Sequence, residues 1–132
     1  MLGENLSVAR EKIMGLAEIH HVAVIVSDVE KAAAFYRAVF EFKDKERLTA
    51  RVSSHGGAWF AVGALELHLQ ERKGETPKCE QHFALLTTEF TLICERIVKY
   101  GGRLEEARLV DGFKKRCFAY DLDNNRIELL SY

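Results

Sequence analysis

Residues 21–25 read His-Val-Ala-Val-Ile, and a similar order returns at residues 82–86 as His-Phe-Ala-Leu-Leu. Both stretches are short and apolar, and the first is rich in β-branched residues, which is typical of buried strands. Self-similarity of this kind indicates a duplicated unit. The sequence therefore predicts two halves that fold alike.

The segments after the first copy predict one helix and further strands. Ser27 and Glu30 form a Ser-x-x-Glu capping box at the start of the helix, and residues 58–62 and 65–69 read as strands joined by a tight turn at residues 63–64. We expect the apolar face of the helix to consist of Ala32, Ala33, Tyr36, Val39 and Phe40.

The second copy is followed by the same order of elements. Thr88 is placed to cap a second helix, residues 117–120 echo residues 59–62, and a turn at residues 123–125 leads into a last strand at 126–130. Each half therefore reads as β-α-β-β-β, and the predicted class is α+β.

These units divide the chain into one domain and an appendage. We expect a single domain at residues 18–132, with modules at about 18–71 and 79–132. Residues 1–17 read as an amphipathic helix, an N-terminal appendage with apolar residues at Leu6, Ile13, Met14 and Leu16.

Composition excludes several classes of function. The chain has 132 residues, of which 48% are hydrophobic, and a formal net charge of -1, so a nucleic-acid partner has no support. Charged residues near the N-terminus and the lack of a long apolar stretch predict no membrane partner and a cytoplasmic location. Cys79, Cys94 and Cys117 share no close spacing, which favours reduced thiols over disulfides or a cysteine metal site.

The duplication also brings metal-competent residues into equivalent positions. His21 and His82 match each other, and Glu128 lies as far after His82 as residue 67 lies after His21. Residue 67 is flanked by Glu66 and His68, which share one face of their strand because side chains alternate. Imidazole and carboxylate ligands suit Zn, Fe, Ni, Mn or Co. In the alternative interpretation, Glu66 and Glu128 simply lie on a solvated strand face.

With these residues in place, the sequence resembles the vicinal oxygen chelate superfamily of glyoxalases, extradiol dioxygenases and bleomycin-binding proteins, and most closely its small glyoxalase-like members. The resemblance rests on residues 19–24, 34–36, 65–69, 82–85 and 121–129. The last stretch is similar to the signature Asp-Pro-Asp-Gly-Asn-x-Ile-Glu-Leu. Leu122 and Asn125 depart from it at the usual Pro and Gly, although Asn tolerates the positive φ that Gly would adopt.

The resemblance implies a curved sheet of two tandem modules around a metal-binding cleft. Its ligands fall on His21, His82, Glu128 and either His68, which we prefer, or Glu66. His20 is expected to point to the opposite face from His21, and His55 is expected in a loop.

The implied activity is that of a metal-dependent lyase or isomerase acting on a small α-oxygenated substrate. The divalent metal, of unknown identity, stabilises charge on a substrate oxygen, Glu128 moves the proton, and Arg116 meets an anionic group of the substrate. Alternatives are an extradiol-type dioxygenase with a two-His-one-Glu iron site at His21, His82 and Glu128, and a metal-free antibiotic-binding resistance protein.

The expected partners are a small-molecule substrate and a second copy of the chain. Small members of the superfamily usually form homodimers, and some build the cleft from modules of different chains. The apolar stripe of Leu6, Ile13 and Met14 is a candidate for that interface, although it could equally pack on its own sheet.

Overall fold

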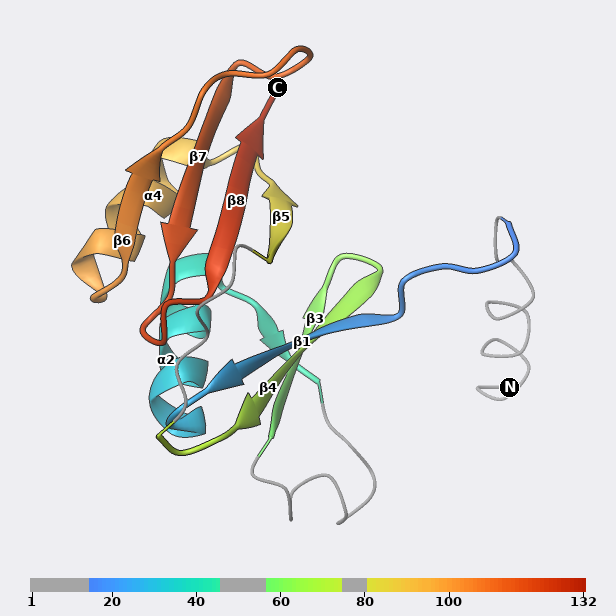
Figure 1. Ribbon diagram of the computed structural model, residues 1–132, viewed down its shortest axis with the longest axis vertical. Coiled ribbons are helices and arrows are strands. Elements are labelled where there is room, and N and C mark those ends of the chain that lie inside the picture. Colours follow the sequence, from blue (N-terminus) through green and yellow to red (C-terminus); the bar gives the residue numbers. More distant parts are fainter. Residues whose placement is uncertain (1–14, 46–56, 75–80) are drawn as a thin grey trace.

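The structure is a computed structural model that describes residues 15–45, 57–74 and 81–132. It confirms the α+β class with two tandem β-α-β-β-β modules (Figure 1). The first module consists of β1 (His21–Val26), α2 (Val29–Phe40), β2 (Lys43–Asp44), β3 (Ala58–Val62) and β4 (Leu65–Glu71). The second consists of β5 (His82–Leu86), α4 (Phe90–Lys99), β6 (Arg103–Glu106), β7 (Lys115–Tyr120) and β8 (Arg126–Ser131). His55, Cys79 and most of the predicted N-terminal helix lie outside the described residues.

Each module has its own mixed sheet. The strand order is β1-β4-β3-β2 in the first, called sheet A here, and β5-β8-β7-β6 in the second, sheet B. The first and last strands of each module run parallel, and the other neighbours are antiparallel. Between residues 15–45, 57–74 and 81–132, no strand pairing joins the two sheets. The predicted repeat is therefore present as two equivalent sheets, with His21 and His82 at the start of equivalent strands.

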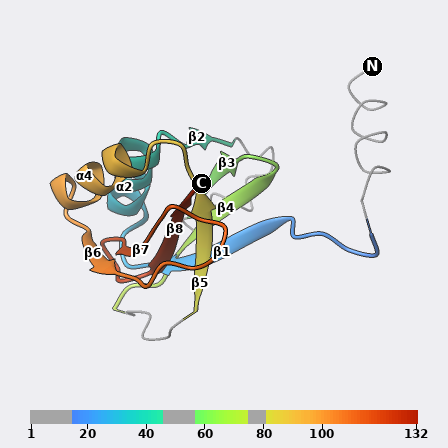
Figure 2. The ribbon, with the colours of Figure 1, turned by 90° about the horizontal axis from the view of Figure 1, so that it is seen from above.

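The core lies between the sheets and the two helices, which pack against each other (Figure 2). Phe35, which the sequence prediction omitted, is buried, whereas the predicted Phe40 is only partly buried. Glycine is required at Gly102, because a Cβ there would lie 2.5 Å from the carbonyl oxygen of Tyr120. The largest fully buried side chains are Tyr36, Phe60, Leu69, Ile97, Ile127, Leu129, Val26 and Val39.

The start of α2 differs from the predicted capping box. Asp28, not Ser27, is the N-cap, and its carboxylate accepts a hydrogen bond from the backbone N–H of Lys31 at 3.0 Å. Ser27 instead donates its backbone N–H, at 3.0 Å, and its hydroxyl to Asp123 of the second module. A tertiary contact therefore takes the hydroxyl that the local pattern assigned to the helix.

The predicted cap of α4 at Thr88 is also wrong. The residue before the helix is Glu89, whose side chain makes no capping hydrogen bond. The hydroxyl of Thr87 accepts the backbone N–H of Glu89 at 2.9 Å, which closes a local turn before the helix begins.

The turn before β8 corrects the expected place of the positive φ. Asn124 has φ 66, so it takes the left-handed conformation that had been expected at Asn125; residue 124 is also the position that aligns with the Gly of the signature Asp-Pro-Asp-Gly-Asn. Asn125 is buried instead, and its side-chain amide donates to the carbonyl oxygen of Ile25 at 2.8 Å.

This turn joins the two modules through a buried carboxylate, Asp121. Tyr36 of α2 donates its hydroxyl to Asp121 at 2.8 Å, and the Asn125 side-chain amide donates to the same carboxylate oxygen at 2.9 Å. The backbone N–H groups of Asp123 and Asn125 donate to the other oxygen. Because Asn125 also bonds Ile25 in β1, the turn fixes both α2 and β1. We call the contacts of Ile25, Ser27, Tyr36, Asp121, Asp123 and Asn125 the module latch.

We predict that Tyr36→Phe lowers the free energy of unfolding by about 1.5–3 kcal/mol, because a buried carboxylate loses a hydrogen-bond donor. Urea denaturation measures the effect. Tyr120→Phe is the matched control: its hydroxyl donates to the more exposed Glu105 at 3.2 Å, so we expect a loss of at most about 1 kcal/mol. Equal losses in the two variants would contradict the importance of the latch.

A second prediction concerns pH. Burial raises the pKa of Asp121 above its ordinary value of 3.8, against hydrogen bonds from Asn125, Tyr36 and Asp123 that lower it. The folded chain then holds this proton more tightly than the unfolded chain, so its contribution to stability falls as the pH rises from 3.8 through the raised pKa. We expect the free energy of unfolding of the wild type, minus that of the non-titrating Asp121→Asn, to fall across this window and to stay level above it. Urea denaturation at a series of pH values tests this, and a difference that grows with pH there would refute it.

Candidate functional site

The first group of predicted ligands lies on the face of sheet A that is turned away from the core. In β1 and β4, His21 is paired in register with Glu66, and Ala23 with His68, so all four side chains share one face. The ring centroids of His21 and His68 are 6.4 Å apart. Both candidates for the fourth ligand therefore lie beside His21.

His68 is held in place by its neighbours. Its ring stacks on Trp59 of β3, with ring centroids 3.8 Å apart and planes 7° from parallel. A Cβ on Gly57 would lie 2.6 Å from Nε2 of His68, so the ring also occupies the space above this glycine. The absence of a side chain at residue 57 therefore lets the imidazole lie flat on the tryptophan.

Glu66 has a different environment. Its side chain is 11% exposed and lies 3.5 Å from the ammonium group of Lys45 and 3.9 Å from Nε2 of His20. The prediction that His20 points away from His21 is wrong, because their Nδ1 atoms are 3.0 Å apart. His20 precedes β1, so strand alternation does not govern it.

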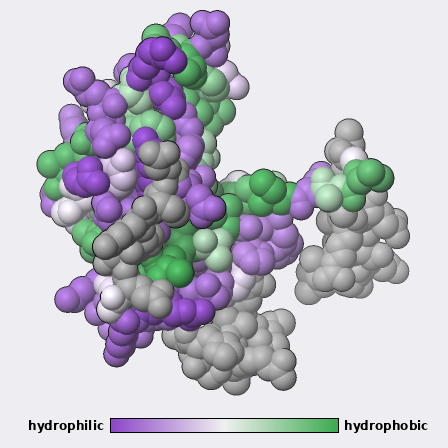
Figure 3. Space-filling model, viewed as in Figure 1, coloured by the Kyte–Doolittle hydropathy of each residue, from purple (hydrophilic) through white to green (hydrophobic). Residues whose placement is uncertain are grey.

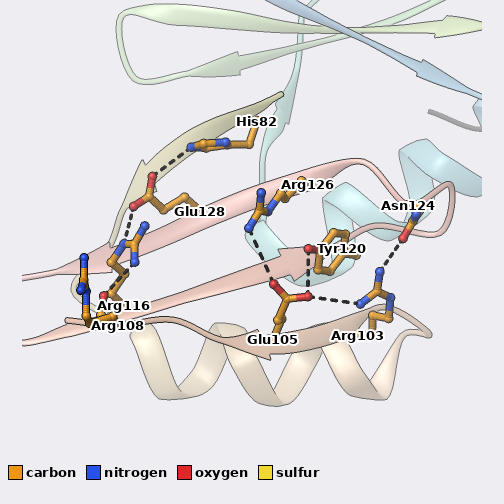
Figure 4. A network of polar contacts seen from close by, with 9 residues as sticks. All are labelled: His82, Arg103, Glu105, Arg108, Arg116, Tyr120, Asn124, Arg126 and Glu128. Atoms are coloured by element: carbon orange, nitrogen blue, oxygen red, sulfur yellow. Dashed lines mark hydrogen bonds and ion pairs between the residues drawn. The ribbon is translucent and has the colours of Figure 1, made fainter. Parts of the chain in front are cut away.

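The second group lies on sheet B. Nε2 of His82 is 3.2 Å from Oε1 of Glu128, while Oε2 of Glu128 accepts a hydrogen bond of 2.6 Å from Nε of Arg116 (Figure 4). Arg116 also donates to the carbonyl oxygen of Arg108 at 2.7 Å. The Arg116 hydrogen bond, opposed by partial burial and supported by the charges of Arg116 and His82, lowers the pKa of Glu128. Glu128 is thus held as a carboxylate, the form that binds a cation.

The predicted ligands form two separate pairs in this chain. His21 with His68 or Glu66 lies on sheet A, and His82 with Glu128 lies on sheet B. Across the three described ranges, no three His, Cys, Asp or Glu side chains form a group that could hold a metal ion. Each pair belongs to its own sheet, so the described residues of one chain do not bring the two pairs together as one metal-binding group. The sequence left open whether the cleft is formed within one chain or across a dimer.

A cavity of about 840 Å³ lies between the modules. It is lined by residues 22–25 of β1, residues 81–83 around the start of β5, and residues 124–126 before and at the start of β8. Of the predicted ligands, His82 is in this lining. The volume falls in the range typical of small-molecule sites.

Sequence reasoning missed a network on sheet B beside Glu128. The guanidinium of Arg126 lies over the ring of Phe118, 3.7 Å from its centroid, and Nη2 of Arg126 is 3.6 Å from Oε1 of Glu105. Arg103 stacks in the same way on Tyr120 (Figure 4). Strand alternation could have indicated Arg126, because it lies two residues before Glu128 and so faces the same side.

Two other observations bear on the sequence predictions. Cys94 and Cys117 are free thiols with Sγ atoms 3.8 Å apart, as expected for reduced cysteines. Among the helices in the described part of the chain, none combines the length and the apolar character needed to cross a membrane.

The sequence was compared with models of known protein families and with known proteins. A sequence profile described as the Glyoxalase/Bleomycin resistance protein/Dioxygenase superfamily matches residues 18–129. No curated protein matches the sequence.

Similar solved structures agree in fold. A glyoxalase family protein from Bacillus anthracis has a TM-score of 0.74 and 22% identity, and the match covers 90% of this chain and 98% of that one. The fosfomycin resistance protein FosX from Listeria monocytogenes has a TM-score of 0.70 and 22% identity over 89% and 95% of the two chains. FosX from Mesorhizobium loti has a TM-score of 0.68 and 21% identity over 90% and 94%. At these identities the likeness shows the fold.

We predict that Gly57→Ala destabilises the protein by about 1–3 kcal/mol, because the added methyl group overlaps the His68 ring. His68→Ala removes that ring, so the double variant should lose less stability than the sum of the two single losses. Urea denaturation of the four proteins of this cycle measures the coupling. Additive losses would show that residue 57 does not position His68.

Proposed function

The chain belongs to the Glyoxalase/Bleomycin resistance protein/Dioxygenase superfamily, and on this premise we propose that it is a metal-dependent enzyme of the glyoxalase type. In this proposal it is a lyase or isomerase that acts on a small α-oxygenated substrate by metal chelation and proton transfer. The observation that carries the proposal is the contact of His82 with the carboxylate of Glu128. Sheet A presents His21, His68 and Glu66 on the corresponding strands.

The donor atoms fit a divalent cation. Each sheet offers imidazole nitrogen close to another nitrogen or carboxylate donor, a set that suits Zn, Ni, Fe, Mn or Co. The ligands we propose are His21, His68, His82 and Glu128, with Glu66 as the alternative to His68. FosX from Listeria monocytogenes has been crystallised with Mn(II), so Mn(II) is a suitable first ion to test.

We further propose that two copies of the chain complete the site. Because the donors are divided between sheets A and B, one copy would supply His21 with His68 or Glu66, and the other would supply His82 with Glu128. A two-fold symmetric dimer then contains two identical sites. The segment before β1 supports association: it extends away from the body (Figure 1) and exposes Leu16 and Ile19, part of the apolar surface seen there in Figure 3.

The residues of sheet B would have distinct roles in the reaction. A bound metal would stabilise negative charge on a substrate oxygen and acidify the adjacent carbon. Glu128 is the proposed group that accepts and returns the proton. Arg116 holds Oε2 of Glu128 and fixes the direction of the carboxylate, and it remains our proposed contact for an anionic group of the substrate. Neutral His82 would bind through its lone pair.

The decisive prediction uses complementation between two defective variants. His21→Ala and Glu128→Ala should each lose most of the bound Mn(II), measured by elemental analysis after dialysis. A heterodimer with one chain of each kind, purified with two affinity tags, contains one site without both residues and one intact site. It should recover about half of the wild-type metal content.

The control and the contradicting results are equally specific. Gln70→Ala, on the same strand as His68, should bind metal like the wild type. If the ligands came from one chain, every site of the heterodimer would lack a ligand, and no metal would return. Full metal content in both single variants would refute the ligand assignment itself.

A further inference from the structure

Arg126 differs from Arg103 and Arg116 on sheet B in the hydrogen bonds that its guanidinium makes. Arg116 donates Nε and Nη1 in hydrogen bonds of 2.6 and 2.7 Å. Arg103 donates Nη2 to the side chain of Asn124 at 2.8 Å. For Arg126, the contact with Glu105 at 3.6 Å is an ion pair beyond hydrogen-bond distance. Its Nε is buried and has no hydrogen-bond partner among the described residues. Because Nε is shut off from the surface, the donors that Arg126 can offer a ligand are those of its Nη groups, of which Nη2 has, within the described part of the chain, only the distant contact with Glu105.

Arg126 lies beside the proposed metal ligands of sheet B. Arg126 is paired in register with His82 across β5 and β8, and it lies on the same strand face as Glu128. Both Arg126 and His82 line the cavity between the modules. The ring of Phe118 supports the guanidinium from one side, so the group is pre-oriented at little entropic cost.

We propose that Arg126 anchors an oxyanion, a carboxylate or phosphate-like group, of a substrate whose α-oxygenated end is held at His82 and Glu128. This inference rests on the proposed function and defines its substrate further, as a small molecule with the charged group a few bonds from the reacting carbon. Arg126, rather than the already hydrogen-bonded Arg116, is then the main anchor of that group. A planar guanidinium suits such groups because it offers parallel N–H donors to two oxygens.

Glu105 is the group that competes for Arg126. It has other partners, however: the hydroxyl of Tyr120 at 3.2 Å and Nη1 of Arg103 at 4.0 Å. Glu105 is also about half exposed, so it keeps water and these contacts when an oxyanion takes its place at Arg126. Removal of its charge should therefore favour anion binding, whereas removal of Arg126 should oppose it.

The test titrates metal-free protein with inorganic phosphate by calorimetry, so it does not depend on the metal. We expect Arg126→Gln to raise the dissociation constant for phosphate about tenfold or more, and Arg126→Lys to raise it by an intermediate factor. Glu105→Gln should tighten binding several-fold. Arg103→Gln is the control, because it removes the same charge from the same face, and it should change the constant less than about twofold.

Two results would refute the inference. If Arg103→Gln and Arg126→Gln weaken phosphate binding equally, phosphate responds only to the general positive charge of this face. If Glu105→Gln binds phosphate more weakly than the wild type, Glu105 does not compete with phosphate for Arg126. If Arg126→Gln fails to fold, the Nε–H nuclear magnetic resonance signal of Arg126 in the wild type takes its place. That signal should shift with phosphate, and an unchanged signal refutes the inference.

A second titration separates this inference from the proposed function. Lactate and malate are both α-hydroxy acids, but only malate carries a second carboxylate. With Mn(II)-loaded protein we expect malate to bind more tightly than lactate, and Arg126→Gln to abolish the difference. Failure of both acids to bind, with the phosphate result intact, counts against the metal site. Malate binding that is indifferent to residue 126 counts against the anchor.

Discussion

The hydrogen bonds of Asp121 are the constraint on which the arrangement of the two modules depends. Among the residues that the structure describes, strand pairing stays within each sheet, so it cannot set how the sheets lie relative to each other. The carboxylate of Asp121 receives Tyr36 from the first module and Asn125 from its own turn, and Asn125 also reaches Ile25. A buried carboxylate tolerates few alternative arrangements, because each lost partner leaves a desolvated charge. The latch thereby also fixes where the cavity beside β1 and β5 opens.

Backbone register accounts for the grouping of the candidate ligands within each module. In both modules the first strand runs parallel to the last, so a histidine at the start of one strand lies next to the acid or histidine of the other. Alternation then turns those side chains to the face away from the core. The presence of one such pair on each sheet is thus a direct consequence of duplication. Contact between the pair on sheet A and the pair on sheet B is not determined by strand pairing in either sheet.

The difference between local and long-range information explains which features the sequence predicted. Element order follows from local periodicity, and the equivalent pairs on the two sheets follow from the return of the residue 21–25 pattern at residues 82–86. The predicted cap at Ser27 failed because Asp123, from the other module, takes its hydroxyl. The predicted cap at Thr88 failed because α4 begins one residue later, with Glu89 in the cap position. Whether the two groups of ligands meet depends on the relative placement of the sheets, which no strand pattern encodes, so the sequence left open whether one chain or two would form the site.

The two oxygens of Glu128 divide its interactions in a way that suits both a structural and a chemical role. Oε2 is committed to Arg116 at 2.6 Å, whereas Oε1 has the longer contact of 3.2 Å with His82. A cation that binds Oε1 and the imidazole would replace this contact and leave the Arg116 hydrogen bond in place. Arg116 also lowers the pKa of Glu128, which favours the ionised ligand but weakens the carboxylate as a base. Proton transfer by Glu128 therefore requires a substrate carbon that is itself made acidic, and this is what links the proposed proton chemistry to a metal.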